Sequence, residues 1–174
     1  GSIRGTSSGA IYLTTSTADL RNLTNSGSIY SANSNAIVVS GGGIGTITNN
    51  STIGTSSSGI FSGTGVDIYN QGQIEVINNA QQKLVITGNL PINYNIIINS
   101  PTHFGQLAVS SPLGATTFGI YGSSNLSKGT FSAVLSGITS ANLTGATSGN
   151  FNGFTWTLNN SSANIWDLIV LGAS

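Results

Sequence analysis

One seven-residue pattern occurs three times in the first half of the chain, and it restricts the fold more than any other feature. The pattern is an apolar residue, any residue, Asn, any residue, Gly or Ser, any residue and Ile. The copies span residues 23–29, 47–53 and 68–74, and their asparagines are 24 and 21 residues apart. Short apolar runs alternate with them at residues 10–13, 36–39 and 59–61. A repeat of this length, built from short strands, predicts a β-solenoid in which each repeat forms one coil.

Stacked coils lie about 4.8 Å apart and place equivalent residues above one another, so each repeat position becomes a ladder. Asn suits a corner because it tolerates left-handed backbone angles and hydrogen-bonds neighbouring backbone with its side chain. We therefore expect a structural ladder of Asn25, Asn49 and Asn70. We expect interior ladders of Ile29, Ile53 and Ile74, and of Ile11, Ile37 and Ile60. The alternative interpretation is an antiparallel sandwich whose turns share this chemistry.

The composition excludes several classes of protein. Charged residues make up 5% of the 174 residues and the net charge is zero, so the chain has no basic patch for nucleic acid. Disorder is also disfavoured, because Ile, Val and Leu recur throughout and the net charge is low. The chain has no cysteine, which excludes disulfides and thiolate metal sites. Gly, Asn, Ser and Thr dominate, and these are poor helix formers.

The repeat ends near residue 89, and the composition changes there. Both tryptophans and five of the six phenylalanines lie after residue 100, which indicates a denser core in this half. We therefore expect residues 1–89 to form coils and residues 90–174 to form a cap over their open end. The expected cap core is Phe118, Phe131, Phe154, Trp156 and Trp166. The expected fold class is all-β, a right-handed parallel β-helix with a C-terminal β-rich capping region.

The second half resembles the C-terminal end of an autotransporter passenger, the exported part of a type V secretion protein. The resemblance covers most of residues 90–174 and is carried by residues 94–102, 104–109, 117–120, 129–137, 156–162 and 166–170. The Asn-Gly-Ile repeats before them are similar to passenger β-helix coils, although any β-solenoid would show such repeats. The region that is matched is the autochaperone-like segment that precedes the outer-membrane barrel in that family.

The resemblance implies a structural stalk at the cell surface whose cap promotes folding and secretion of the passenger. The implied partner is the chain's own outer-membrane barrel, which is absent from this sequence, and polar β-edges also favour self-association. Passengers of this family include adhesins, so the alternative function is an adhesin that binds a glycan or a host or neighbouring-cell surface. Family membership does not choose between these functions.

The residues that carry chemistry are few. His103 is the only histidine, and the acids are Asp19, Asp67, Glu75 and Asp167. A Ser–His–Asp site needs these groups in contact, and a hydrolase on a β-helix needs clustered carboxylates. Turn residues are the expected role of these side chains, so we predict no enzyme, no metal site and no cofactor. Trp156, Trp166 and Tyr121 could stack on sugar rings, but Trp in an alternating strand is more often part of a core.

Overall fold

The computed structural model describes residues 1–6, 9–32, 34–54 and 66–172. The first strands are β1 (Ser2–Gly5), β2 (Ile11–Leu13), β3 (Asp19–Asn25), β4 (Ser28–Ser31), β5 (Ile37–Val39), β6 (Gly43–Asn49), β7 (Thr52–Gly54), β8 (Ile68–Asn70), β9 (Gln73–Asn79) and β10 (Leu84–Asn89). The later strands are β11 (Asn93–Ile96), β12 (Ile98–Ser100), β13 (His103–Phe104), β14 (Leu107–Leu113), β15 (Thr116–Ile120), β16 (Gly129–Ser136), β17 (Leu143–Thr144), β18 (Ser148–Phe151), β19 (Phe154–Ser162) and β20 (Ile165–Leu171). The described residues contain no α-helix, only a 3₁₀ turn at Ser140–Asn142, so the expected all-β class is confirmed.

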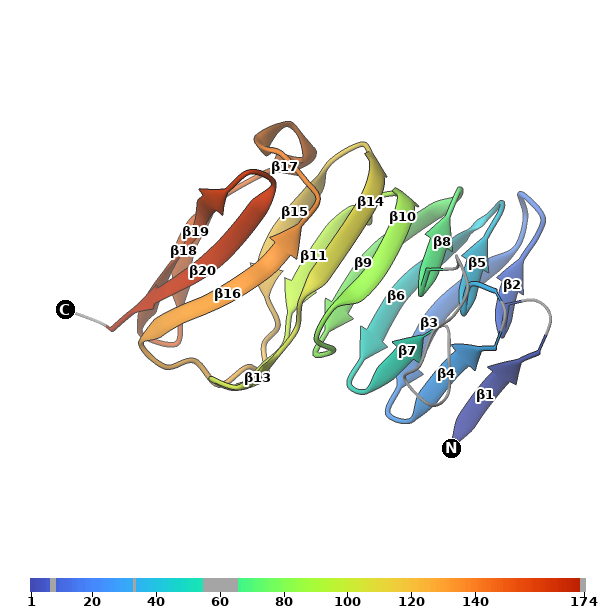
Figure 1. The fold of residues 1–174 in the computed structure, drawn as a ribbon, viewed down its shortest axis with the longest axis horizontal. Coiled ribbons are helices and arrows are strands. Elements are labelled where there is room, and N and C mark those ends of the chain that lie inside the picture. Colours follow the sequence, from blue (N-terminus) through green and yellow to red (C-terminus); the bar gives the residue numbers. More distant parts are fainter. Residues whose placement is uncertain (7–8, 33, 55–65, 173–174) are drawn as a thin grey trace.

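Strands β1 to β9 pass through three parallel sheets in the same order three times. Each passage visits a three-stranded, a nine-stranded and a six-stranded sheet in turn. Every pairing among these strands is parallel, so the antiparallel sandwich is wrong for this part of the chain. The strands lie side by side along an elongated molecule, from β1 to β3 at one end to β18 to β20 at the other (Figure 1).

Parallel pairing in register stacks apolar residues into interior ladders. Ile29 pairs with Ile53 in the three-stranded sheet, and Ile11 pairs with Ile37, which pairs with Ile68 in the nine-stranded sheet. The prediction for Ile74 is wrong, because Ile74 pairs with Ile44 in the six-stranded sheet. Ile60, the third member of the other predicted ladder, lies outside the described residues.

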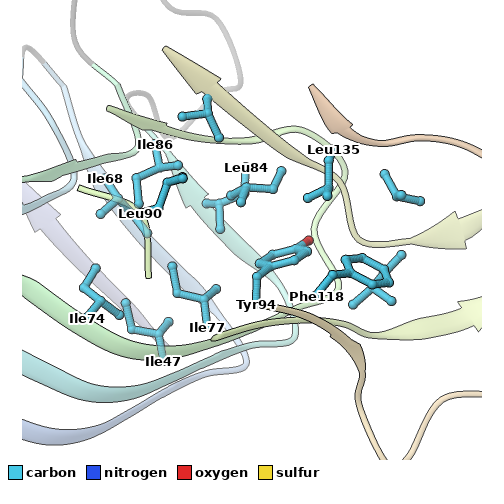
Figure 2. Close-up of a cluster of buried hydrophobic side chains, with 14 of the residues drawn as sticks. Ile47, Ile68, Ile74, Ile77, Leu84, Ile86, Leu90, Tyr94, Phe118 and Leu135 are labelled. Carbon is cyan, nitrogen blue, oxygen red and sulfur yellow. The ribbon is translucent and has the colours of Figure 1, made fainter. Parts of the chain in front are cut away.

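The ladders form one continuous core with few polar side chains. Ile37, Ile44, Ile47, Ile68 and Ile77 are fully buried. In Figure 2 the isoleucines of adjacent strands converge on the same interior, and the rings of Tyr94 and Phe118 continue it toward the second half of the chain. Tyr94 pairs with Ile77 on one side and with Phe118 on the other, so the aromatic rings extend an aliphatic ladder.

Sheet pairing is continuous across residue 89, where the sequence predicts a change of domain. β10 pairs with β8 on one side and with β14 on the other, both in parallel. Apart from the small antiparallel pair β12–β13, the change to antiparallel pairing comes in the nine-stranded sheet, where β16 pairs in parallel with β14 and antiparallel with β20. β18, β19 and β20 then complete the nine-stranded sheet as an antiparallel meander. The division at residue 89 stays a prediction, and the antiparallel end begins at β16.

Two glycines with the same backbone angle allow a matched test of this packing. Gly137 and Gly114 both have φ of 81°, in the left-handed region that L-residues avoid. A Cβ at Gly137 would overlap the carbonyl oxygen of Val109, whereas a Cβ at Gly114 has nothing within 4 Å.

We expect Gly114→Ala to lower the free energy of unfolding by about 1 kcal/mol, the cost of the backbone angle alone. Gly137→Ala should lower it by about 2–4 kcal/mol, because the overlap with Val109 adds to the same strain. Urea denaturation followed by circular dichroism measures both values. Equal losses would show that the close approach to Val109 relaxes at no cost.

Candidate functional site

The titratable side chains are dispersed. His103 lies exposed in the short strand β13. Arg21 joins two acids at the surface, with Nε 2.9 Å from Asp19 Oδ1 and Nη2 3.7 Å from Glu75 Oε1. The described residues include no group of three His, Cys, Asp or Glu side chains that could hold a metal ion. In the same residues no helix has the length and apolar character needed to cross a membrane.

The other two acids hold backbone amides in place. Asp167 Oδ1 accepts a hydrogen bond of 2.8 Å from the amide of Ala133, which has a left-handed φ of 50° within β16. Asp67 Oδ2 accepts a hydrogen bond of 2.8 Å from the amide of Val85 at the start of β10. Each of these carboxylates therefore fixes an irregular or terminal part of a strand.

Three buried asparagines form a hydrogen-bonded column across the six-stranded sheet. Asn25 Nδ2 donates to Asn49 Oδ1 at 2.9 Å, and Asn49 Nδ2 donates to Asn79 Oδ1 at 3.1 Å. These three residues are in register at the ends of β3, β6 and β9, and at most 5% of each is exposed. Asn70 does not belong to the column, so this member of the predicted ladder is wrong and Asn79 takes its place.

The error at Asn70 has a local cause. Asn25 Oδ1 and Asn49 Oδ1 each accept a hydrogen bond from the amide two residues later, and Asn70 Oδ1 does the same with Gly72. The same turn therefore forms at a different corner, between β8 and β9, where Asn70 Nδ2 donates to the carbonyl of Asn89 at 2.8 Å. A short motif identifies the turn and not the corner that uses it.

The sequence analysis also missed Gln81, which ends the three-stranded sheet. Gln81 Oε1 accepts from the amide of Ile53 at 2.8 Å, and Gln81 Nε2 donates to the carbonyl of Ile53 at 2.9 Å. The side-chain amide of Gln81 thus makes the two hydrogen bonds that the backbone of a further strand would make with Ile53. Gln81 Oε1 also accepts from Asn49 Nδ2 at 2.8 Å, which joins the edge of β7 to the column.

Tyr94 closes the column at its inner end. Asn79 Nδ2 donates to the Tyr94 hydroxyl at 3.2 Å and to two backbone carbonyls, those of Gln81 and Gln106. Burial raises the pKa of Tyr94 well above its ordinary value, and the hydrogen bond from Asn79 only partly opposes this. The phenol stays protonated, so the column is neutral along its length.

The predicted cap core divides between two sheets. Trp156 packs edge-on against Phe118, with ring centroids 5.6 Å apart, and Phe131 packs against Phe104 at 5.2 Å. Phe118 lies in β15 of the six-stranded sheet and Phe104 in the small β12–β13 sheet, so the two contacts join the antiparallel end to both of these sheets. Trp166 is 8% exposed and its Nε1 donates to the carbonyl of Ile138 at 3.1 Å. Phe154 is only partly buried and packs at the margin.

Asp67 gives a testable pH dependence. Its side chain is buried without an ion pair to any described residue, and burial raises the pKa of Asp67 to about 6, an effect that the hydrogen bond from Val85 only partly opposes. The native state therefore keeps a proton that the unfolded chain, with a pKa of 3.8, has released. Raising the pH from about 3 to about 7 should lower the free energy of unfolding by about 3 kcal/mol.

In Asp67→Asn this loss should disappear, because the amide can still accept from Val85 but does not titrate. The measurement is urea denaturation across that pH range. The exposed Asp19→Asn variant is the control and should keep the pH dependence of the original chain. An unchanged slope in Asp67→Asn would refute the assignment to Asp67.

Comparisons of the chain with family models, with curated proteins and with solved structures found no match. The function is therefore argued from the arrangement of the residues alone.

Proposed function

We propose that this chain is a right-handed parallel β-helix that forms the C-terminal part of an autotransporter passenger. In this proposal it is a structural stalk exported through the outer membrane to the cell surface, and its cap promotes folding of the coils. The observation that carries the proposal is the junction at β16, where a strand paired in parallel with β14 begins an antiparallel meander. A cap of this kind lets the first coil form against a surface that is already folded.

Three further features support a stalk. Strands β1 to β9 visit three sheets in a fixed order, as the chain path of a three-sided β-helix would require. The buried asparagines of the column use their side chains for internal hydrogen bonds. The aromatic contacts of Trp156 with Phe118 and of Phe131 with Phe104 give the cap a specific seat on the adjoining sheets.

The test compares residues 1–174 with residues 1–89 by far-UV circular dichroism and limited proteolysis. We expect the whole chain to be β-rich and resistant, and residues 1–89 to be disordered and rapidly cleaved, because β10 then loses β14 and β9 loses β11. Addition of separate residues 90–174 should restore part of the resistance if the cap acts as a template. Residues 1–89 that fold equally well alone would contradict the capping function.

A further inference from the structure

A groove opens on the nine-stranded sheet. It has a volume of about 450 Å³, and its walls include Tyr69, Gln71, Thr87, Asn89, Ser111 and Leu113. These residues come from the neighbouring strands β8, β10 and β14 (Figure 1) and from the turn after β8, so the groove runs across the sheet. The volume is within the range of small-ligand sites, about 300–1,000 Å³.

A break in the pairing of β10 with β14 shapes the groove. The register shifts between Thr87 and Gly88, so that Ser110 and Pro112 have partners and Ser111 is the extra residue. Ser111 has a left-handed φ of 49° and Gly88 a φ of 100°, as the irregularity requires. The bulge turns Ser111 toward the groove, and Leu113 beyond it stays 60% exposed.

The polar groups of the groove are oriented before any ligand arrives. Gln71 Nε2 donates to the Tyr69 hydroxyl at 2.9 Å, and Asn89 Nδ2 donates to the carbonyl of Gly72 at 2.8 Å. These bonds hold each side-chain amide, and Gln71 Oε1 and Asn89 Oδ1 accept no hydrogen bond from the described residues. Both oxygens belong to residues that line the groove, together with hydroxyl groups on Tyr69, Thr87 and Ser111.

The lining determines the chemistry of the ligand. Among the described residues none that line the groove is charged, so a phosphate, sulfate or carboxylate would find no counter-charge there. The Tyr69 ring and the Leu113 side chain offer apolar surface next to acceptors for hydroxyl hydrogens. A ligand with an apolar face and a rim of neutral hydroxyl groups fits both. We propose that this groove binds a neutral saccharide, with the sugar ring against Tyr69 and its hydroxyls on Gln71 and Asn89.

Tyr12 provides a matched control for Tyr69. Tyr12 pairs with Val38, which pairs with Tyr69, so both tyrosines belong to the same row of the same sheet. Tyr12 is 51% exposed and is not among the groove residues. A variant at Tyr12 removes an exposed ring from the same face and leaves the groove intact.

The experiment is a titration of the ¹⁵N-labelled chain with cellotriose, maltotriose, xylotriose and chitotriose, followed by amide chemical shifts. We expect at least one trisaccharide to shift the amides of Tyr69, Thr87 and Ser111 in a saturable way. Tyr69→Ala should weaken that binding about tenfold, whereas Tyr12→Ala should leave it unchanged. The spectrum of each variant also shows whether it is folded. Gln71→Ala removes one of the two proposed acceptors and should weaken the binding as well.

Three results would overturn the proposal. They are no shift with any of the four trisaccharides, equal binding by the original chain and Tyr69→Ala, and stronger binding of a sulfated heparin tetrasaccharide than of every neutral sugar. The proposal does not rest on the stalk function. If the chain binds saccharide and residues 1–89 fold alone, the capping function is refuted and the saccharide site stands. If residues 1–89 need the cap and no saccharide binds, the saccharide site is refuted and the capping function stands.

Discussion

Replacing Asn49 with Ala is expected to lower the free energy of unfolding by about 3–5 kcal/mol, one of the two largest effects of any single substitution we predict. Asn49 is fully buried and is the central member of the asparagine column. Its side chain accepts from Asn25 and donates to Asn79 and to Gln81. The substitution removes these bonds, leaves a cavity, and deprives the partner groups of a hydrogen bond.

The adjacent Asn50→Ala is the control, because Asn50 is exposed and should change stability by no more than about 0.5 kcal/mol. A second variant, Asn49→Leu, fills the volume but cannot make the hydrogen bonds. We expect it to lose nearly as much stability as Asn49→Ala, since the unpaired partners remain. Urea denaturation of the three variants gives the comparison. Similar stability of Asn49→Ala and Asn50→Ala would mean that the column contributes little to folding.

The column also shows how far the sequence could be interpreted without a structure. Asn25 and Asn49 were predictable because one full passage of the chain separates them and both end a strand of the same sheet. The prediction for Asn70 was wrong because the turn that Asn70 forms with Gly72 depends on two residues only, and the same turn can form at any corner. Asn79 was missed because Gln81 stands two positions after it, where the pattern requires Gly or Ser.

A longer pattern would have identified the correct residue. Each strand of the six-stranded sheet in the first half carries two apolar residues three positions apart, and an Asn two positions after the second. The pattern occurs at residues 20–25, 44–49 and 74–79. It specifies the inward face of a strand as well as the turn, so it is tied to one corner. The three asparagines are then 24 and 30 residues apart, an irregularity that a search for a constant period rejects.

The aromatic residues of the second half were easier to predict as buried than to place. Composition indicates that large rings enter a core, but it does not say which sheet carries them. Phe118 was assigned to the cap and lies in the six-stranded sheet, where it continues the ladder of Ile77 and Tyr94. Gln81 gave no signal at all, because its role depends on the end of a sheet formed by residues almost thirty positions earlier.

Replacing Trp166 with Ala should be as damaging as the loss of Asn49, for a different reason. Trp166 is the second residue of β20, which pairs antiparallel with both β16 and β19, so its indole ring lies where the cap meets the parallel strands. The substitution removes a large buried ring and leaves the carbonyl of Ile138, a fully buried residue, without its donor. We expect a loss of about 4–5 kcal/mol in the free energy of unfolding.

Two variants separate these contributions. Trp166→Phe keeps most of the ring and loses only the indole N–H, so it should cost about 1–2 kcal/mol. Leu171→Ala changes the same strand at a residue that is 58% exposed, and it should change stability by no more than about 0.5 kcal/mol. Equal losses in Trp166→Ala and Leu171→Ala would show that the indole ring does not hold the cap in place.

The kinetics of the same variants test whether the cap folds first. If the antiparallel end is the template on which the parallel strands assemble, the contacts of Trp166 are already formed in the transition state for folding. Trp166→Ala should then mainly slow refolding, whereas Asn49→Ala, in a part of the chain that assembles later, should mainly accelerate unfolding. Stopped-flow refolding and unfolding in urea give both rates. If instead Asn49→Ala slows refolding and Trp166→Ala mainly accelerates unfolding, the folding nucleus lies in the asparagine column. That result would contradict a cap that acts as a template.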